Sequence, residues 1–173
     1  MPKKSSRRGH QTAVRKSVPL ITNRRATFDY ELRDNLTVGL ELTGAETKAA
    51  RLGRVQLRGA YVTARVNHTT GQAELFLINA AFSLNTNAPK NSGQPTSTVD
   101  TRARKILAKR SEIDRLVAQN NSGMTIVPTK LLTAGRYVKL VIALGRGKKK
   151  YDKRESIKKR DQVRDNAKFL KHL

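Results

Sequence analysis

The sequence predicts a mainly β body that carries a basic extension at each end. Apolar and polar residues alternate with the period of a half-buried strand over 60–66 and 137–144. A polar turn at 67–71 joins the first of these runs to another β-type run at 74–79. Strand and helix signals do not alternate as they do in parallel sheets. An antiparallel barrel of the OB type, with about six strands and two or three short helices, is the most economical closure.

The first part of the body predicts a hairpin followed by a helix. We expect a strand over 28–33, a turn at Asp34 and Asn35, and an antiparallel partner strand over 36–42. Thr43 and Glu46 then have the spacing of a capping box, which predicts a short helix over 44–51.

The second part of the body begins with a long polar stretch. Residues 85–101 are rich in Asn, Pro, Ser, Thr and Gly without periodicity, which predicts a flexible loop before the basic cluster 102–105. Ser111 and Asp114 have the spacing of a second capping box. They open a helix whose apolar stripe, which should pack on the sheet, consists of Ile113, Leu116 and Val117.

The last two strands follow this helix. Residues 124–132 are of β type, and Pro128 within them predicts an edge position or a bulge. Residues 137–144 predict the final strand, on which Val138, Leu140, Ile142 and Leu144 share one face. We expect glycines 145 and 147 to let the chain turn sharply as it leaves the sheet.

Charge divides the chain into three parts. Of the +23 formal charge, eight basic residues and no acid lie in residues 1–25, and 12 basic against four acidic residues lie in 145–173. We expect a disordered basic arm at 1–22, an RNA-binding body at 23–146 and a basic tail at 147–173. So much charge predicts a polyanionic partner, with nucleic acid the first choice and a membrane surface the competitor.

Neither a membrane segment nor an enzyme is predicted. The chain lacks 18 consecutive apolar residues and an N-terminal apolar leader, so we expect a cytoplasmic protein, and it has no cysteine. Its three histidines lie in the tails and in a turn, so no catalytic or metal constellation can be nominated. The segment 145–148 lacks the spacing of a phosphate-binding loop. We therefore expect no catalysis, metal or cofactor.

Four sequence blocks, in order, resemble the small protein B family, the SsrA-binding proteins that accompany transfer-messenger RNA (tmRNA) in bacterial ribosome rescue. The blocks are NRRA at 23–26, GLELTGAETKAAR at 39–51, TRARKIL at 101–107 with EIDRL at 112–116, and GKKKYDKRESIKKRD at 147–161. The chain departs from the family pattern at Thr27, Phe28 and Thr37. The resemblance implies an OB-type barrel with flanking helices, in agreement with the prediction from the residues.

The resemblance also implies partners and sites. The body would bind the tRNA-like domain of tmRNA, and the tail would enter the decoding centre and the empty messenger RNA channel of ribosomes stalled without a stop codon. Elongation factor Tu and alanyl-tRNA synthetase would be indirect partners through tmRNA. The expected RNA-binding residues are Arg24, Arg25, Glu46, Lys48, Arg51, Arg102, Arg104, Lys105, Leu107 and Lys139. The expected tail residues are Lys148, Lys149, Tyr151, Asp152, Lys153, Arg154, Ile157, Lys158, Lys159, Arg160, Phe169 and Leu170.

The C-terminal tail should change conformation when it binds a partner. Free in solution, residues 147–173 should be largely disordered, since their like charges repel, and should become helical in a polyanionic tunnel. Tyr151 could stack on an exposed rRNA base or pack against the barrel. A basic ribosomal protein and a general RNA-binding OB protein remain alternatives, and a DNA-compacting protein is less favoured because the body exposes few aromatic residues.

Overall fold

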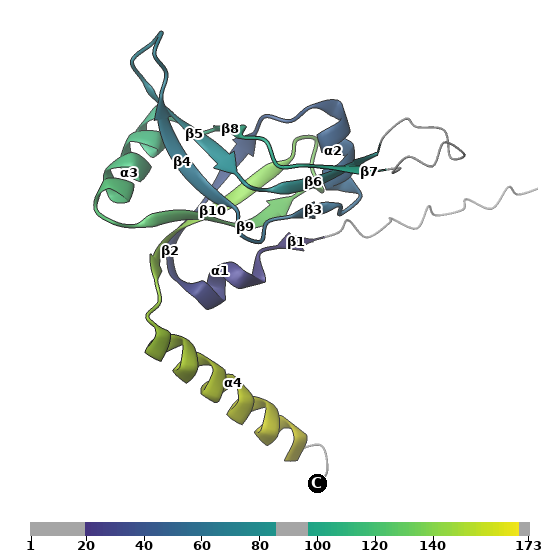
Figure 1. Ribbon diagram of the computed structural model, residues 1–173, viewed down its shortest axis with the longest axis vertical. Coiled ribbons are helices and arrows are strands. Elements are labelled where there is room, and N and C mark those ends of the chain that lie inside the picture. The colour runs from purple at the N-terminus through teal and green to yellow at the C-terminus, as the bar shows by residue number, and fades with distance from the viewer. Residues whose placement is uncertain (1–19, 86–96, 170–173) are drawn as a thin grey trace, which may run out of the picture.

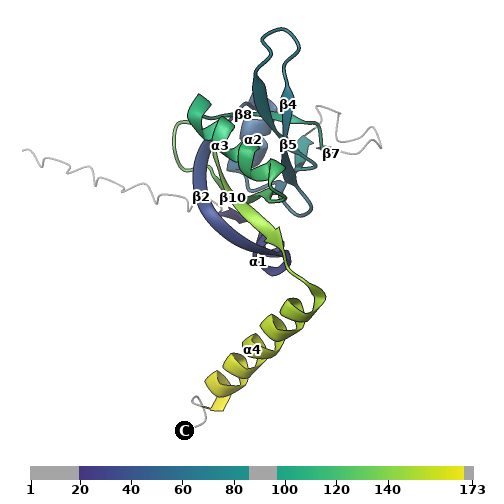
Figure 2. The same ribbon diagram turned by 90° about the vertical axis from the view of Figure 1, so that its left-hand side faces the viewer.

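The computed structural model describes residues 20–85 and 97–169 (Figure 1). The elements in chain order are β1 (Ile21–Thr22), α1 (Arg24–Asp29), β2 (Tyr30–Leu40), α2 (Gly44–Arg51), β3 (Val55–Gln56), β4 (Tyr61–Val66), β5 (Ala73–Ile78), β6 (Ala81–Asn85), β7 (Ser97–Asp100), β8 (Arg104–Leu107), α3 (Arg110–Asn121), β9 (Thr125–Leu132), β10 (Lys139–Gly147) and α4 (Lys150–Phe169). Helix α4 extends away from the body in both views (Figures 1 and 2).

Six antiparallel strands close into a ring. They follow one another in the order β9, β10, β2, β8, β5 and β4, and β4 returns to β9 through the pairing of Val62 with Ile126. Strand β1 adds to β9 outside the ring, and β3, β6 and β7 form a small second sheet. The predicted antiparallel barrel of about six strands is confirmed.

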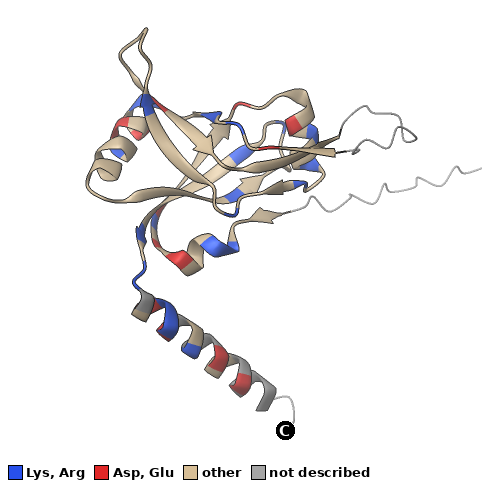
Figure 3. Cartoon of the chain, in the orientation of Figure 1, with Lys and Arg blue, Asp and Glu red and all other residues tan. Residues whose placement is uncertain are grey.

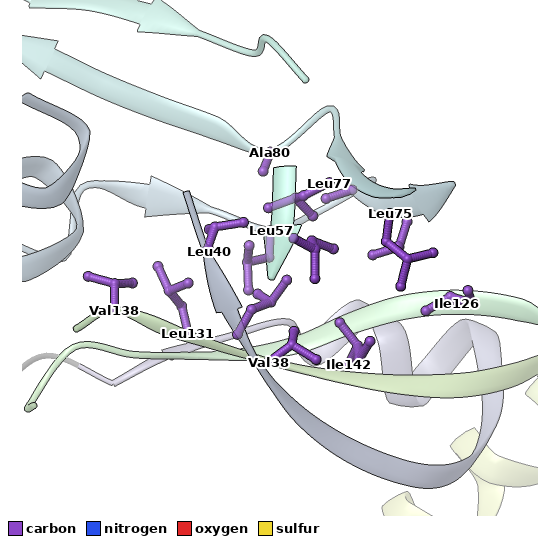
Figure 4. Close-up of a cluster of buried hydrophobic side chains, with 14 of the residues drawn as sticks. Val38, Leu40, Leu57, Leu75, Leu77, Ala80, Ile126, Leu131, Val138 and Ile142 are labelled. Carbon is purple, nitrogen blue, oxygen red and sulfur yellow. The ribbon is translucent and has the colours of Figure 1, made fainter. Parts of the chain in front are cut away.

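The apolar residues of alternating strand positions fill the ring (Figure 4). Leu75, Ile126, Leu140 and Ile142 are fully buried. The predicted inward face of the last strand, from Val138 to Leu144, is confirmed. Each such side chain removed from water contributes about 1.5–3 kcal/mol. The outward-pointing residues of the same strands are thereby held in fixed positions.

The beginning of the body differs from the prediction. Phe28 and Asp29 belong to α1, because Asn23 caps this helix by accepting a hydrogen bond from the Ala26 amide (3.2 Å). The predicted turn at Asp34 and Asn35 is wrong, since β2 runs through both residues. Their turn chemistry instead makes a β-bulge: Asp34 has φ of 49°, and the register with β10 shifts at this point.

Strand β7 and helix α3 also differ in part from the prediction. Ser97–Asp100 form β7, which pairs with β6, so this end of the predicted 85–101 loop is a strand, whereas 86–96 lie outside the described residues. Helix α3 begins at Arg110, where Glu112 accepts a hydrogen bond from the Lys109 amide (2.9 Å), so the predicted cap at Ser111 is wrong. Its stripe is confirmed, with Leu116 buried.

The prediction of an edge or a bulge at Pro128 resolves to a bulge. Strand β9 lies between β1 and β10, and its register with β10 shifts where Ile142 pairs with Pro128. Across this shift Thr129 donates a hydrogen bond to the Val141 carbonyl (3.0 Å). The proline therefore occupies a position where the ladder is already irregular.

A few residues that we had assigned to the two extensions belong to strands of the body. Residues 21–22 pair with β9 rather than belonging to an arm, and 1–19 lie outside the described residues. Strand β10 continues to Gly147. Gly145 serves close approach rather than a turn, since a Cβ there would lie 3.0 Å from the Tyr30 Cβ. Lys150–Phe169 form the helix α4, and the disorder of this tail in the free protein stays a prediction.

Candidate nucleic-acid interface

A buried ion-pair network lies beneath helix α2. Arg102 donates two hydrogen bonds of 2.8 Å to the Glu46 carboxylate, and Arg104 donates one of 2.9 Å. The Arg104 guanidinium also lies 3.9 Å from the centroid of the Phe82 ring and donates to the Ala80 carbonyl. Glu46 and Arg104 are buried, whereas the Arg102 side chain is 47% exposed.

This burial corrects two predicted RNA contacts. Glu46 and Arg104 face the interior, so they cannot meet a phosphate in this structure, and their role is to hold α2 on the strands that follow it. Glu46 also accepts a hydrogen bond from the Thr43 amide (2.7 Å), which completes the predicted capping box. The sequence signal was an acid within a helix, followed by two arginines two residues apart, of which the second begins a β-strand. Only the fold shows that they meet.

The charge state of Glu46 follows from these contacts. Burial alone would raise the pKa of its carboxyl. The hydrogen bonds from Arg102 and the Thr43 amide, and the nearby Arg104, outweigh this and lower the pKa to about 2. Glu46 is therefore ionised at neutral pH, and the network is a buried carboxylate shared by two guanidinium groups.

Helix α2 presents two of the predicted cations to solvent. Lys48 and Arg51 are exposed, and Arg51 donates a hydrogen bond to the Arg136 carbonyl (3.0 Å). This bond ties α2 to the loop before β10. The Arg136 guanidinium lies 5.3 Å from the centroid of the Tyr137 ring, and Tyr137 is 67% exposed. The sequence analysis did not select this aromatic residue, although its place at the head of the last strand was visible.

The outer face of the barrel carries further predicted residues. Lys139 pairs with Gly39 on one side and with Leu132 on the other, and Gly39 pairs with Leu107. A Cβ on Gly39 would lie 3.1 Å from the Leu107 Cβ, so the glycine makes room for that leucine, which is 52% exposed. Lys130 lies two residues before Leu132 on the same outward face and is exposed. Sequence reasoning missed Lys130, although strand alternation could have found it.

Lys105 occupies the neighbouring strand. Its ammonium lies 2.7 Å from the Glu74 carboxylate, and this hydrogen bond is the main cause of a lowered pKa for Glu74. The predicted contact residue is thus paired with an acid in this structure. A phosphate would have to compete with Glu74 for it.

Arg24 and Arg25 do not belong to this surface. They lie on α1, near the start of α4, whereas α2 lies at the other end of the body (Figures 1 and 3). Arg25 forms an ion pair of 2.9 Å with Asp29, one helical turn later. The predicted RNA-binding residues therefore form two groups, one on α1 and one around α2 and β10.

The first turn of α4 is attached to α1. Lys148 donates its amide to the Asp29 carbonyl (2.9 Å), and the Lys153 ammonium lies 2.8 Å from the Asp29 carboxylate. Lys153 is the main cause of the lowered pKa of Asp29, against a smaller opposing effect of burial. Asp152, in the first turn of α4, accepts a hydrogen bond from the amide of Lys149, the residue before the helix (3.0 Å). The Lys148 ammonium also donates to the Thr27 carbonyl (3.0 Å), so Lys148 and Lys153, both among the predicted tail residues, anchor the helix to α1.

The rest of α4 points into solvent. Tyr151 is 69% exposed, which does not fit the alternative that it packs against the barrel, and its hydroxyl lies 3.4 Å from Glu155. Arg154, Ile157 and Lys158 are exposed as well. The side chains of Lys159, Arg160 and Phe169 and the whole of Leu170 lie outside the described part of the chain.

Two chemical possibilities have no support in the described residues. No three His, Asp or Glu side chains there are grouped as metal ligands. No helix among them is both long enough and apolar enough to cross a membrane. What the described surface offers is fixed positive charge next to exposed apolar and aromatic side chains, a combination that suits RNA.

Comparisons with known proteins agree with this surface chemistry. The protein-family model described as "SmpB protein" matches residues 20–172. An SsrA-binding protein of Acaryochloris marina is 42% identical over 150 residues, which cover 86% of this chain and 91% of the relative. One from Gloeobacter violaceus is 42% identical over 147 residues, covering 84% and 90%.

A solved structure extends the likeness to three dimensions. It is described as "tmRNA-SmpB: a journey to the center of the bacterial ribosome". It matches with a TM-score of 0.55 and 32% identity, and the match covers 80% of this chain and 94% of that one. Together with the family match, these relatives show that the chain belongs to the SmpB protein family.

Proposed function

We propose that this chain is a tmRNA-binding protein of trans-translation. It binds the tRNA-like domain of tmRNA and brings it to ribosomes stalled on messenger RNA without a stop codon. The matched relatives are named for binding SsrA, and the matched structure is described as lying in the bacterial ribosome. The observation in this chain that carries the proposal is the separation of two basic surfaces, one on the barrel and one on a projecting helix.

The outer surface of the barrel, together with α2, binds the tRNA-like domain of tmRNA. Its contact residues are the exposed or half-exposed members of the predicted set, namely Lys48, Arg51, Arg102, Lys105, Leu107 and Lys139. Five of these are cations, and five phosphate contacts give a slope of about −4 for log affinity against log salt concentration. Leu107 supplies an apolar platform beside Lys139. Glu46 and Arg104 contribute by fixing α2 from inside.

Helix α4 binds the ribosome. The described Lys and Arg side chains of α4 lie in its first half, on a rod that leaves the body, and this shape is suited to the empty messenger RNA channel (Figure 3). Lys148, Lys149, Tyr151, Asp152, Lys153 and Arg154 would lie near the decoding centre, and the rest of the helix further along the channel. Exposed Tyr151 is free to stack on an rRNA base, which contributes about 1–3 kcal/mol.

The remaining partners come through tmRNA. The RNA is charged by alanyl-tRNA synthetase and delivered by elongation factor Tu, and the whole process takes place in the cytoplasm. The protein acts by shape and charge, without turnover chemistry of its own. A basic ribosomal protein or a general RNA-binding OB protein is not favoured, because the relatives are named for one RNA.

A reconstituted tagging reaction tests the proposal. Stalled ribosomes, alanine-charged tmRNA and elongation factor Tu are mixed with and without the protein, and addition of the tag peptide to the nascent chain is measured. We expect tagging only when the protein is present, with tmRNA charged equally well in both reactions. Equal tagging without the protein would overturn the proposal. So would stoichiometric presence of the protein on vacant ribosomes, which would indicate a ribosomal protein.

A further inference from the structure

A small hollow lies between helix α3 and the bulged part of strand β2. It has a volume of about 160 Å³, and residues of β2, α3 and β10 surround it. The bulge lies where Asp34 has φ of 49° and where the register of β2 with β10 shifts, so the backbone of β2 departs there from regular pairing. The fold thus builds the hollow from three elements that are distant in sequence.

The buried part of the lining is apolar. Leu116 and Leu144 are 4% and 2% exposed, and Leu36 packs against the same core. An apolar cavity of about 150 Å³ holds one molecule of benzene. The hollow therefore has room for one side chain of a partner, and not for a helix.

An unpaired hydrogen-bond acceptor also lines the hollow. The side-chain oxygen Oε1 of Gln119 is buried, and it has no hydrogen-bond partner among the described residues. A buried acceptor without a partner destabilises the folded chain, because it has lost its bonds to water. A ligand that brings a donor into the hollow would remove this cost.

The hollow carries more acid than base, unlike the chain as a whole, in which 36 basic residues stand against 13 acidic ones. Asp34 and Glu112 contribute carboxylates, and Arg115 is the one cation among the described residues that line it. The Arg115 guanidinium lies 3.1 Å from the Asp34 carboxylate, which compensates its charge. The Glu112 carboxylate would repel a phosphate and attract a cation. The hollow is therefore not suited to RNA.

These features together fit a ligand with an aliphatic stem and a cationic donor. A lysine side chain has a stem of four carbons, which it buries along apolar surface, and an ammonium group with three donors. The stem would lie against the leucines, and the ammonium would have the Gln119 oxygen and the Glu112 carboxylate as acceptors. The ammonium is compact, whereas the guanidinium of arginine is a wider planar fork, so we expect lysine to be preferred.

We propose that the hollow between α3 and β2 is a docking site for a partner protein, which inserts one lysine side chain from a basic segment. In Figure 1 the helix α3 lies on the opposite side of the body from α2 and apart from α4. A protein bound here would therefore leave both basic surfaces open to RNA. RNA on those surfaces would also reduce the repulsion that the +23 chain exerts on a basic segment, so the partner should bind best to the RNA-bound chain.

The test is a titration of the full chain with a short glycine peptide that has blocked ends and one central lysine. NMR follows the side-chain amide of Gln119 and the methyl groups of Leu36 and Leu144, at physiological salt so that the overall charge of the chain is screened. We expect saturable shifts at these groups. The same peptide with norleucine in place of lysine keeps the stem without the ammonium, and should bind about tenfold more weakly. Equal binding of the two peptides, or shifts only elsewhere, would overturn the proposal.

Two variants assign the contacts. Gln119→Leu removes the unpaired acceptor, and Glu112→Gln removes the charge but keeps an acceptor for the Lys109 amide. Each should weaken binding of the lysine peptide about three- to tenfold and leave the norleucine peptide unchanged. Because Gln119→Leu deletes a buried acceptor that has no partner, its unfolding midpoint should not fall below that of the wild type. The matched control is Gln72→Leu, at an exposed position between β4 and β5, which should change neither quantity.

Two further ligands separate a protein partner from other sources of the same chemistry. Spermidine carries ammonium groups on an aliphatic chain, and tighter binding of spermidine than of the lysine peptide would make the hollow a polyamine site. A short single-stranded RNA that shifted the same signals would overturn the assignment to protein, as would a Gln119→Leu variant that bound the lysine peptide like the wild type. No arm of the test uses tmRNA or ribosomes, so its outcome is independent of the proposed function.

Discussion

The barrel and helix α4 both present basic residues, but they hold them differently. Lys139 extends from a strand whose opposite face is fully buried, and α2 is fixed by a buried carboxylate between two arginines. On α4 no described side chain is buried, and the helix meets the body through its first turn at Asp29. The barrel thus presents a preformed surface, whereas α4 depends on one attachment and on whatever it later contacts.

This difference suits the barrel to recognising a folded RNA and suits α4 to entering a channel. A rigid surface binds a folded RNA with little loss of conformational entropy. A loosely attached helix can change direction at the junction after Gly147 while its own backbone hydrogen bonds remain. The body is therefore suited to a fixed RNA shape, and the tail to a channel whose direction relative to the body is set elsewhere.

The largest expected effect comes from removing α4. Truncation after Gly147 keeps β10 whole, because its pairing with β2 and β9 ends at or before that residue. We expect affinity for the tRNA-like domain to remain within about threefold while tagging on stalled ribosomes is lost. Binding titration and the reconstituted tagging reaction measure the two effects separately.

Truncation after Leu144 serves as the comparison for truncation after Gly147. It removes three residues that pair with β2, so it should lower the stability of the barrel as well as tagging. If truncation after Gly147 weakened RNA binding as severely as tagging, or left tagging intact, the division between body and tail would be wrong.

The next effect concerns the buried network. Replacing Glu46 with Ala removes the buried carboxylate 2.9 Å from Arg104 and leaves this arginine with the partly exposed Asp100 carboxylate at 3.4 Å. Breaking one partner of such a buried pair costs about 3–5 kcal/mol of unfolding free energy. Denaturant unfolding measures the loss. The control is Glu41→Ala, which removes an exposed acid just before α2 and should cost less than about 0.5 kcal/mol. Equal effects of the two substitutions would show that the network does not stabilise the barrel.

The lowered pKa of Glu46 should make the stability of the chain depend on pH. Its pKa is about 2 in the folded chain and 4.5 when unperturbed, so the stabilisation is complete above pH 4.5 and is lost as the pH falls towards 2. Over that window the loss is about 3 kcal/mol. The variant Glu46→Gln should lack this part of the acid sensitivity. Unfolding of both chains between pH 6 and pH 3 should therefore show a difference in stability that shrinks with falling pH.

The barrel could be predicted because its signals are local. Strand alternation over 137–144 and the capping box of Thr43 and Glu46 each lie within a few residues, and both are confirmed. The turn predicted at Asp34 and Asn35 failed because the same residue types also suit a bulge. Only pairing along the whole of β10 decides between the two outcomes.

The site could be predicted only in part, because its geometry depends on pairings distant in sequence. Glu46 and Arg104 are 58 residues apart, and nothing local shows that this arginine is internal. Arg24 was listed as an RNA contact together with Lys48 and Arg51 of α2, but it lies on α1, directly after Asn23, whose side-chain amide donates to the Leu57 carbonyl. A count of cations predicts an RNA partner, while the fold decides which cations face it.

A smaller effect is expected when a single lysine of the RNA-binding surface on the barrel is removed. Lys139 is exposed between Gly39 and Leu132, so Lys139→Ala should weaken binding of the tRNA-like domain by about 1–3 kcal/mol if the ammonium bonds a phosphate. Lys109→Ala, at the start of α3, is the matched loss of an exposed lysine. A titration in which both variants bind equally well would remove Lys139 from the contact surface.

The smallest expected effect concerns the attachment of α4. Asp29→Asn removes the carboxylate that pairs with Lys153 and Arg25 but leaves the Asp29 carbonyl, which accepts from the Lys148 amide. An ion pair open to solvent contributes about 0.2–1 kcal/mol, so amide exchange in the first turn of α4 should rise about 1.5- to 5-fold. Because the pKa of Asp29 is lowered, this contribution is present above its ordinary value of 3.8 and is lost as the pH falls further.

The control for this attachment is Asp114→Asn, which breaks the exposed pair with Arg110 on α3 (2.8 Å). It should leave exchange in α4 unchanged, since α3 lies away from α4 (Figure 2). High salt should raise exchange in the wild-type helix towards the level of Asp29→Asn, because salt screens a solvent-accessible pair. If the variant and the wild type exchanged alike at low salt, the two hydrogen bonds from Lys148, to the Asp29 and Thr27 carbonyls, would hold α4. Its direction would then be fixed by the strand that precedes it.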